Sequence, residues 1–149
     1  MTEGIPEEIP EFGAAAAGAD YLLRPGGYVV ARNARGEIAT VSTPRGLFLP
    51  GGGVEGLETP EQAAVREALE ECGLRVRLTG ALGRADELVY AAEEGVHYRK
   101  RCSFFSAELT GRVAGGEADH RLVWMAPEEA ASQLRHRSQR WAVTAHGRR

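Results

Sequence analysis

The sequence predicts a single domain of the α+β class. Its 149 residues are enough for one hydrophobic core, and 43% of them are apolar. Short apolar runs with strand character lie before and after one strongly signalled helix, and further helical patterns follow near the C-terminus. Strands around a central helix, with helical segments at the end, make an α+β pattern.

The chain is expected to begin with a mobile segment, followed by a β-hairpin. Residues 1–18 are rich in Gly, Ala, Glu and Pro, and we expect them to be mobile or loosely attached. The domain then covers residues 19–149. Two β-rich runs, 27–32 and 37–42, flank residues 33–36, whose composition indicates a turn. A short strand over residues 47–49 leads into three glycines.

The central helix is predicted over residues 60–72. Thr59 is a suitable N-cap, Gln62 completes a capping box, and Pro60 fits the first helical position. Gly73 follows the last periodic residue and suits a C-terminal cap. Residues at i, i+4 and i+7 form an apolar stripe that should face the core. The stripe consists of Val65, Leu69 and Cys72, with Ala64 and Ala68 beside it, and the small alanines allow another element to approach closely.

The remainder of the chain is predicted to contain four strands and two helices. The strands cover residues 75–79, 86–91, 98–109 and 122–125, and the second and third form a hairpin around residues 93–95. The helices cover residues 127–134, with Pro127 at the start, and 139–145.

Three carboxylates gather on one face of the central helix. Glu67, Glu70 and Glu71 stand at i, i+3 and i+4, where like charges repel unless a cation binds among them. A solvated acidic face is the alternative, but such a face normally intersperses Lys or Arg, and here only Arg66 is available. A divalent metal is the natural guest of such a site, and metals bound by carboxylates usually serve phosphate chemistry.

A glycine run just before the helix adds to this interpretation. Gly51, Gly52 and Gly53 allow a ligand to approach the main chain. The run is not a P-loop, because no Gly-Lys-Ser/Thr follows it and Lys100 is the only lysine in the chain. A glycine-rich turn that leads into a metal-binding helix is a phosphate site in outline.

Residues 52–74 resemble the Nudix box, whose pattern is G-x5-E-x7-R-E-U-x-E-E-x-G-U with U a bulky aliphatic residue. Ala68 is smaller than the pattern requires at its position. The resemblance implies an α/β/α sandwich around a mixed sheet, with the box as loop–helix–loop. It also implies hydrolysis of a pyrophosphate bond in a nucleoside diphosphate linked to a group X. The matching residues are Gly52, Glu58, Arg66, Glu67, Glu70, Glu71, Gly73 and Leu74.

The same resemblance implies a metal site. Glu67 and Glu71 would be the principal ligands of Mg²⁺, with Mn²⁺ as a substitute. Glu70 would bind directly or through water, and the carbonyl of Gly51 would be a further ligand. Arg66 would pair with Glu58 and brace the loop against the helix.

The implied catalytic residues are Glu67, Glu70, the brace Arg66 and an acid further along the chain. Many family members place such an acid in a loop before a Trp, and here Glu117 and Asp119 precede residues 122–124. We favour Glu117, with Asp119 as the alternative, because loop length varies. A carboxylate of this kind takes a proton from the attacking water.

The residues that recognise group X are signalled less strongly. Tyr90 lies 16 residues past the box, near where members acting on diadenosine polyphosphates tend to carry a tyrosine that can stack on a base; an ordinary strand aromatic is the alternative. Strand alternation sends Arg99 and Arg101 to one face and Lys100 to the other, and a solvated face is again the alternative. The candidate substrate-binding residues are Arg45, Gly52, Gly53, Tyr90, Arg99 and Arg101.

Composition limits the partners. The net charge of −3 and the lack of a long basic face argue against a nucleic-acid polymer. The acidic start lacks the pattern of a signal peptide, and no apolar run approaches a membrane span, so we expect a cytoplasmic protein. Cys72 and Cys102 are expected to be buried free thiols. The oligomeric state stays open, with a homodimer as one alternative.

Two classes of function fit these observations. The favoured class is a Mg²⁺-dependent hydrolase that cleaves a dinucleoside polyphosphate or an oxidised or ordinary nucleoside triphosphate; nucleotide sugars come third. The other class is a non-catalytic nucleotide-sensing module. Such modules often lose acids of the box, and this box is whole.

Overall fold

The computed structural model describes residues 8–146. The strands are β1 (Glu11–Phe12), β2 (Tyr21–Ala31), β3 (Ile38–Thr43), β4 (Gly46–Phe48), β5 (Gly51–Gly53), β6 (Leu74–Ala91), β7 (Val96–Arg112) and β8 (Arg121–Met125). The helices are α1 (Pro60–Cys72), α2 (Pro127–Gln133) and α3 (Arg137–His146). A mixed five-stranded sheet has the order β1–β6–β7–β2–β5, and a three-stranded antiparallel sheet has the order β4–β3–β8.

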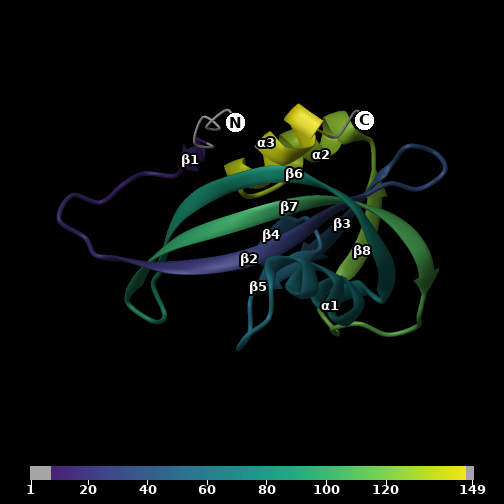
Figure 1. Cartoon of the computed structure of the whole chain (residues 1–149), viewed down its shortest axis with the longest axis horizontal. Coiled ribbons are helices and arrows are strands. Elements are labelled where there is room, and N and C mark those ends of the chain that lie inside the picture. Colours follow the sequence, from purple (N-terminus) through teal and green to yellow (C-terminus); the bar gives the residue numbers. More distant parts are fainter. Residues whose placement is uncertain (1–7, 147–149) are drawn as a thin grey trace, which may run out of the picture.

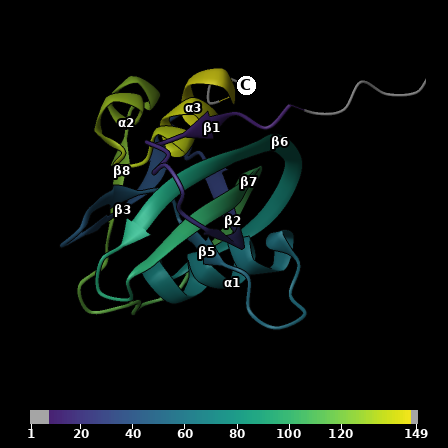
Figure 2. The same cartoon turned by 90° about the vertical axis from the view of Figure 1, so that its left-hand side faces the viewer.

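The elements form three layers, as Figure 1 shows: α1 lies on one side of the large sheet, and α2 and α3 lie on the other. The view from the side in Figure 2 shows the same separation. Alternation along β2 explains it, because Val29 and Ala31 join the core beneath α1 while Val30 joins the core beneath α2 and α3. The predicted α+β class and the sandwich with a mixed sheet are therefore confirmed.

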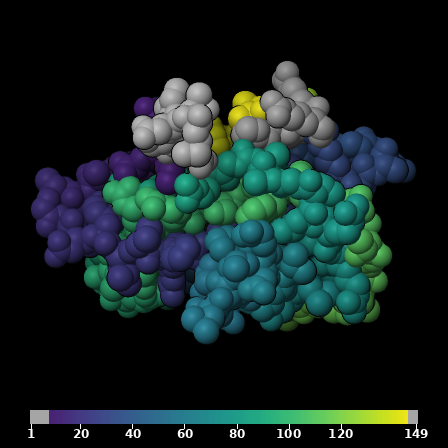
Figure 3. Space-filling model, in the orientation of Figure 1, coloured from purple at the N-terminus to yellow at the C-terminus, as the bar shows by residue number. Residues whose placement is uncertain are grey.

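Helix α1 begins and ends as the sequence predicts. The Thr59 hydroxyl accepts a hydrogen bond from the Gln62 N–H at 3.2 Å, and the Gln62 side chain accepts one from the Thr59 N–H at 2.9 Å. The left-handed residue Gly73 ends the helix with φ of 70°. In Figure 3, α1 and the loop before it form the lower centre of the visible face.

The buried side of α1 differs from the predicted stripe. Cys72 is buried, but Val65 is 38% exposed, so its place in the stripe was wrong. Small side chains carry the contact, because α1 packs directly on β2 at Gly27, and the expected close approach at Ala64 and Ala68 is confirmed. A Cβ atom at Gly27 would lie 1.9 Å from the Pro60 carbonyl oxygen and 3.1 Å from the Cβ of Ala64. The closely packed alanines are Ala63, Ala64 and Ala68.

The hairpin of β6 and β7 is longer than predicted. The expected strands 75–79 and 86–91 are parts of the single strand β6. Its pairing with β7 shifts register near Gly80 and Gly83, so the strand bends at these irregularities instead of ending. Strand β2 likewise begins at Tyr21 rather than at residue 27. It passes through Pro25, which is tolerated because β5 joins that side of β2 only from Gly26 onward.

The other predicted elements appear with small changes at their ends, and both cysteines are buried free thiols, as expected. The expected mobile segment differs in part: residues 1–7 lie outside the described residues, but β1 pairs in parallel with β6. The Asp86 N–H donates to the Pro10 carbonyl at 2.8 Å, and Phe12 packs on the core. Within residues 8–146, no helix has the length and apolar character needed to cross a membrane.

Candidate active site

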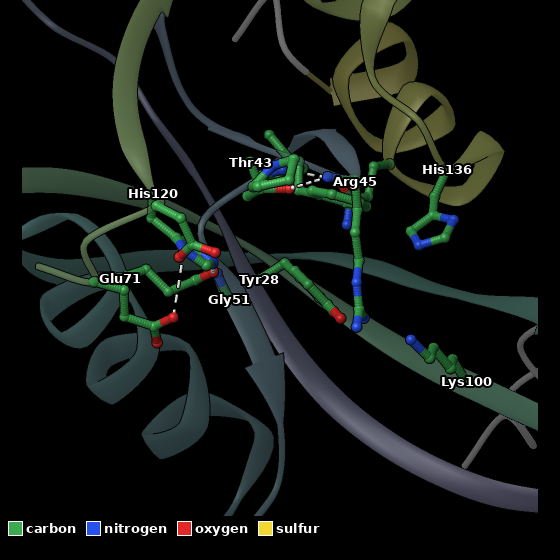
Figure 4. A pocket seen from close by; sticks show the side chains of 14 residues that line it. Tyr28, Thr43, Arg45, Gly51, Glu71, Lys100, His120 and His136 are labelled. Carbon is green, nitrogen blue, oxygen red and sulfur yellow. Dashed lines mark hydrogen bonds and ion pairs between the residues drawn. The ribbon is translucent and has the colours of Figure 1, made fainter. Parts of the chain in front are cut away.

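A cavity of about 380 Å³ lies where α1, β5, the loop before β8 and the start of α3 meet. One end is acidic and contains Glu71, Glu117 and Asp119. The opposite end is basic and contains Arg45 and Lys100. Figure 4 shows Glu71, His120 and Gly51 grouped on one side, Tyr28 in the middle, and Arg45, Lys100 and His136 on the other side.

Glu71 anchors the acidic end. Its Oε1 atom accepts a hydrogen bond from the Gly51 N–H at 2.9 Å, which ties α1 to the glycine run. The side chain is buried, and burial raises its pKa to about 7, with the charges of Glu67 and Glu117 contributing in the same direction. A buried carboxylate in this condition is favoured as a ligand for a cation, because a cation would offset both causes of the shift.

Arg66 binds the predicted acidic residues together. Its Nε and Nη2 atoms donate to both oxygens of Glu58, at 2.7 and 2.9 Å, and Nη1 lies 2.5 Å from Glu67 Oε1 and 3.1 Å from Glu70 Oε2. The Nη2 atom also donates to the Gly53 carbonyl at 3.1 Å. The structure thus contains the expected pair of Arg66 and Glu58. Together these bonds of Arg66 fix the loop, the helix and the glycine run relative to one another.

The three glutamates of the predicted triplet do not have equal surroundings. Glu67 packs on Gly52, where a Cβ atom would lie 2.8 Å from the Glu67 carboxylate, so a larger residue there would displace the Glu67 side chain. Burial raises the pKa of Glu67, and the bond from Arg66 offsets part of the effect. Glu70 is half exposed at the outer side of Arg66. One guanidinium cannot neutralise all these carboxylates, so the oxygen-rich donor set fits a hard divalent cation.

His120 joins the downstream acids to the box. Its Nδ1 atom lies 2.8 Å from Asp119 Oδ1 and 3.3 Å from Glu117 Oε2, and its Nε2 atom lies 3.8 Å from Glu71 Oε2. Among residues 8–146, one group of potential metal ligands has donor atoms that all lie within 4.8 Å of one another, and it consists of Glu117, Asp119 and His120. Of the two acids, Glu117 raises the pKa of both Glu67 and Glu71 through its charge. Sequence reasoning missed His120, whose one signal was its place beside Asp119.

The predicted substrate-binding residues are spread over neighbouring cavities. Arg45 lines the main cavity. Tyr90 lines an adjoining cavity of about 640 Å³, and Gly52 and Gly53 line one of about 340 Å³ beside Glu67.

Arg99 and Arg101 lie elsewhere: both bond to the buried Asp86, at 3.1 Å for Arg99 and 3.0 Å for each of two contacts from Arg101. Burial would raise the pKa of Asp86, but these bonds outweigh it and hold the pKa below its ordinary value.

The structure brings Lys100 to the cavities in place of its two neighbours. Alternation along β7 does send Lys100 to the face opposite Arg99 and Arg101, and that face is the one that the cavities occupy. Sequence reasoning also missed Tyr28 and His136. Burial raises the pKa of Tyr28 well above its ordinary value, and burial lowers the pKa of His136, so both are neutral near pH 7.

Comparisons with known proteins bear on the family and the fold. The family model described as the NUDIX domain matches residues 20–146. Among solved structures, a NUDIX hydrolase from Nitrosomonas europaea is 20% identical with a TM-score of 0.69, over 84% of this chain and 88% of that one. The E. coli dihydroneopterin triphosphate pyrophosphohydrolase is 20% identical with a TM-score of 0.69, over 82% and 93%. A MutT NUDIX hydrolase from Burkholderia pseudomallei is 25% identical with a TM-score of 0.61, over 84% and 98%.

Proposed function

The chain belongs to the Nudix family and is a pyrophosphohydrolase, and from this premise we propose that it is a Mg²⁺-dependent hydrolase of dinucleoside polyphosphates or nucleoside triphosphates. Nudix hydrolases use divalent metal ions and act on small nucleotide substrates. The observation that carries the proposal is the cavity with two ends of opposite charge. Its acidic end suits a cation and its basic end suits phosphate oxygens.

We assign the acidic end to the metal. Glu67 and Glu71 would hold the ion, with Glu70 directly or through water and the Gly51 carbonyl as a further ligand. When bound, the ion polarises the phosphoryl oxygens and favours an attacking hydroxide. The burial of Glu71 and its bond to the Gly51 N–H support this assignment, because they hold the carboxylate in place before any ion arrives.

The other residues bind, orient and move a proton. Arg45 and Lys100 bind phosphate oxygens at the basic end, where charge-assisted hydrogen bonds are strong. Glu117 takes the proton from the attacking water, since it lines the same cavity as Glu71. His120 orients Glu117 and Asp119 through its Nδ1 atom. We further propose that residues 19–149 form the catalytic unit.

The function is tested by a substrate panel with Mg²⁺, repeated in EDTA. A nucleoside triphosphate should yield monophosphate and pyrophosphate, and a dinucleoside tetraphosphate should yield mono- plus triphosphate, both separated by chromatography. EDTA should stop all hydrolysis and Mn²⁺ should restore it. Full activity in EDTA, or the absence of any hydrolysed nucleotide with Mg²⁺, would contradict the proposal.

Arg66→Lys should weaken metal binding without unfolding the protein. Lysine keeps the charge but cannot bond both oxygens of Glu58 together with Glu67, so the glutamates lose their fixed positions. We expect the affinity for Mn²⁺, measured by titration, to fall by about 10- to 100-fold. Arg77→Lys is the matched control, since Arg77 pairs with Glu108 on the exposed surface. Equal metal affinity in the two variants would remove Arg66 from the metal site.

A further inference from the structure

The second cavity, of about 640 Å³, continues from the basic end of the main one. The two share Arg45, Phe48, Lys100 and His136. We call the second cavity the distal pocket. Two further arginines, Arg24 and Arg135, line it but not the main cavity. Four cations thus surround a space that lies beyond the proposed site of cleavage.

Two of these cations stand directly side by side. Arg24 in β2 and Lys100 in β7 are partners in the parallel pairing, and both line the distal pocket. Like charges placed opposite each other on neighbouring strands are destabilising. Among residues 8–146, no ion pair joins either of them to a carboxylate. Arg99 and Arg101, by contrast, both pair with Asp86, and Arg99 also pairs with Glu11.

The nearby acids are engaged elsewhere. Glu94, the acidic residue in the lining, accepts a hydrogen bond from the Tyr98 hydroxyl. Glu87 lies opposite Lys100 in β6, but it is buried and accepts a hydrogen bond from the Ser138 N–H at 2.9 Å. One lining carboxylate against four cations leaves the distal pocket with unbalanced positive charge.

The other two cations reach the pocket from a different part of the fold. Arg45 belongs to the turn between β3 and β4, and Figure 4 shows its charged end directed toward the same space as Lys100. Arg135 packs over Gly46, and its backbone N–H donates to the Leu47 carbonyl at 2.9 Å. Separate segments therefore hold cations around one space, which implies that the ligand of this space is a multiply charged anion.

The aromatic residues of the pocket are partly engaged with other side chains. The Arg24 guanidinium covers the ring of Tyr98 at 4.7 Å from its centroid. His136 lies against Phe48 with the ring centroids 5.3 Å apart, and His97 lies against Tyr90 at 4.6 Å, although Tyr90 is 56% exposed. The four cations, not these rings, are therefore the main feature that the pocket offers to a ligand.

We propose that the distal pocket binds phosphate groups that extend beyond the diphosphate being cleaved. The inference rests on the proposed function and narrows its substrate class to nucleotides with a long polyphosphate chain. A dinucleoside tetraphosphate has such a chain, and a nucleotide sugar does not. Arg24 and Arg135 are then residues that determine specificity, while Arg45 and Lys100 serve both cavities.

The test compares Arg24→Gln/Arg135→Gln with Arg35→Gln/Arg75→Gln, which removes the same charge from exposed sites outside the pocket. Inorganic tripolyphosphate is titrated into each folded variant in EDTA, with melting temperatures as the check of folding. We expect the affinity for tripolyphosphate to fall by about tenfold or more in the pocket variant and to stay unchanged in the control. The affinity of the control should also depend more steeply on salt concentration than that of the pocket variant. With Mg²⁺, kcat/KM of the pocket variant should fall by about tenfold for a dinucleoside tetraphosphate and stay within about twofold for a nucleotide sugar.

The two proposals fail in different ways. The proposal for the distal pocket alone would be overturned if both variants bound tripolyphosphate equally well. It would also be overturned if kcat/KM of the pocket variant fell equally for the dinucleoside tetraphosphate and the nucleotide sugar. If the wild type hydrolyses no nucleotide but binds tripolyphosphate through Arg24 and Arg135, the proposed function fails and the anion pocket stands.

Discussion

Glu71→Gln is expected to abolish hydrolysis while the protein stays folded. Glutamine keeps an oxygen that can accept the hydrogen bond from the Gly51 N–H, so the link between α1 and β5 survives. The negative charge, on which the proposed metal site depends, is lost. We expect kcat to fall by about a thousandfold or more, which corresponds to about 4 kcal/mol of transition-state stabilisation. Steady-state kinetics with saturating Mg²⁺ measures the loss.

Although Glu71→Gln should abolish activity, it should stabilise the folded protein in the absence of metal. The pKa of Glu71 is raised to about 7, so its ionised form is disfavoured in the folded protein. The stability that the protonated carboxyl supports is fully present below the ordinary pKa of glutamate and is lost as the pH rises through 7. In EDTA, Glu71→Gln should therefore melt at a higher temperature than the wild type at pH 8. The difference should shrink as the pH falls to 5.

Glu61→Gln is the matched control, because Glu61 lies exposed in the first turn of the same helix. It should keep full activity and the wild-type melting temperature. A Glu71→Gln protein that hydrolyses nucleotides at the wild-type rate would remove Glu71 from the mechanism. One that loses activity only because it unfolds would show lower melting temperatures at every pH.

Gly27→Ala should be among the most destabilising single-methyl additions in the chain. The new Cβ would lie 1.9 Å from the Pro60 carbonyl oxygen and 2.8 Å from the Pro60 carbonyl carbon, so α1 must move away from β2. Overpacking of this kind costs about 3 kcal/mol of unfolding free energy. Because Glu67 and Glu71 move with α1, activity should fall as well. Chemical denaturation and kinetics measure the two effects.

The control for this prediction is Gly111→Ala in β7. A Cβ atom there meets only the Arg75 side chain at an ordinary 3.5 Å, and the backbone is not left-handed. Alanine should then leave stability unchanged or raise it slightly, since it restricts the unfolded chain. If both alanine variants unfold at the same denaturant concentration, the close docking of α1 on Gly27 is not the source of the effect.

Local signals in the sequence predicted the central parts of the site well. The cap at Thr59 and the spacing of the glutamates depend on neighbouring residues within the loop and the helix, while the pairing of Arg66 with Glu58 was implied by the resemblance to the Nudix box. The strand alternation around Lys100 was also predicted correctly, but it could not say which face meets a cavity. That choice depends on Arg135 and His136, which pack there from 35 residues or more along the chain.

The features that were not predicted depend on tertiary packing. Two separate strands were predicted over residues 75–79 and 86–91, yet pairing with β7 continues between them by shifting register near Gly80 and Gly83. The small alanines of α1 did predict a close approach, but Val65, which fits an apolar stripe by its spacing, is exposed. The spacing could not show that β2 meets the helix at Gly27, on the alanine side.

The docking of α1 on β2 bears on the proposed role of the distal pocket. Gly27 supports the helix that carries Glu71, and Arg24, three residues earlier in the same strand, lines the distal pocket. Three residues of extended chain span about 10 Å. Strand β2 therefore fixes part of the spacing between α1 and the distal pocket. On the proposed substrate, exchanging pocket side chains would change how firmly the polyphosphate chain is held, whereas changing the preferred chain length would require inserting or deleting residues in β2.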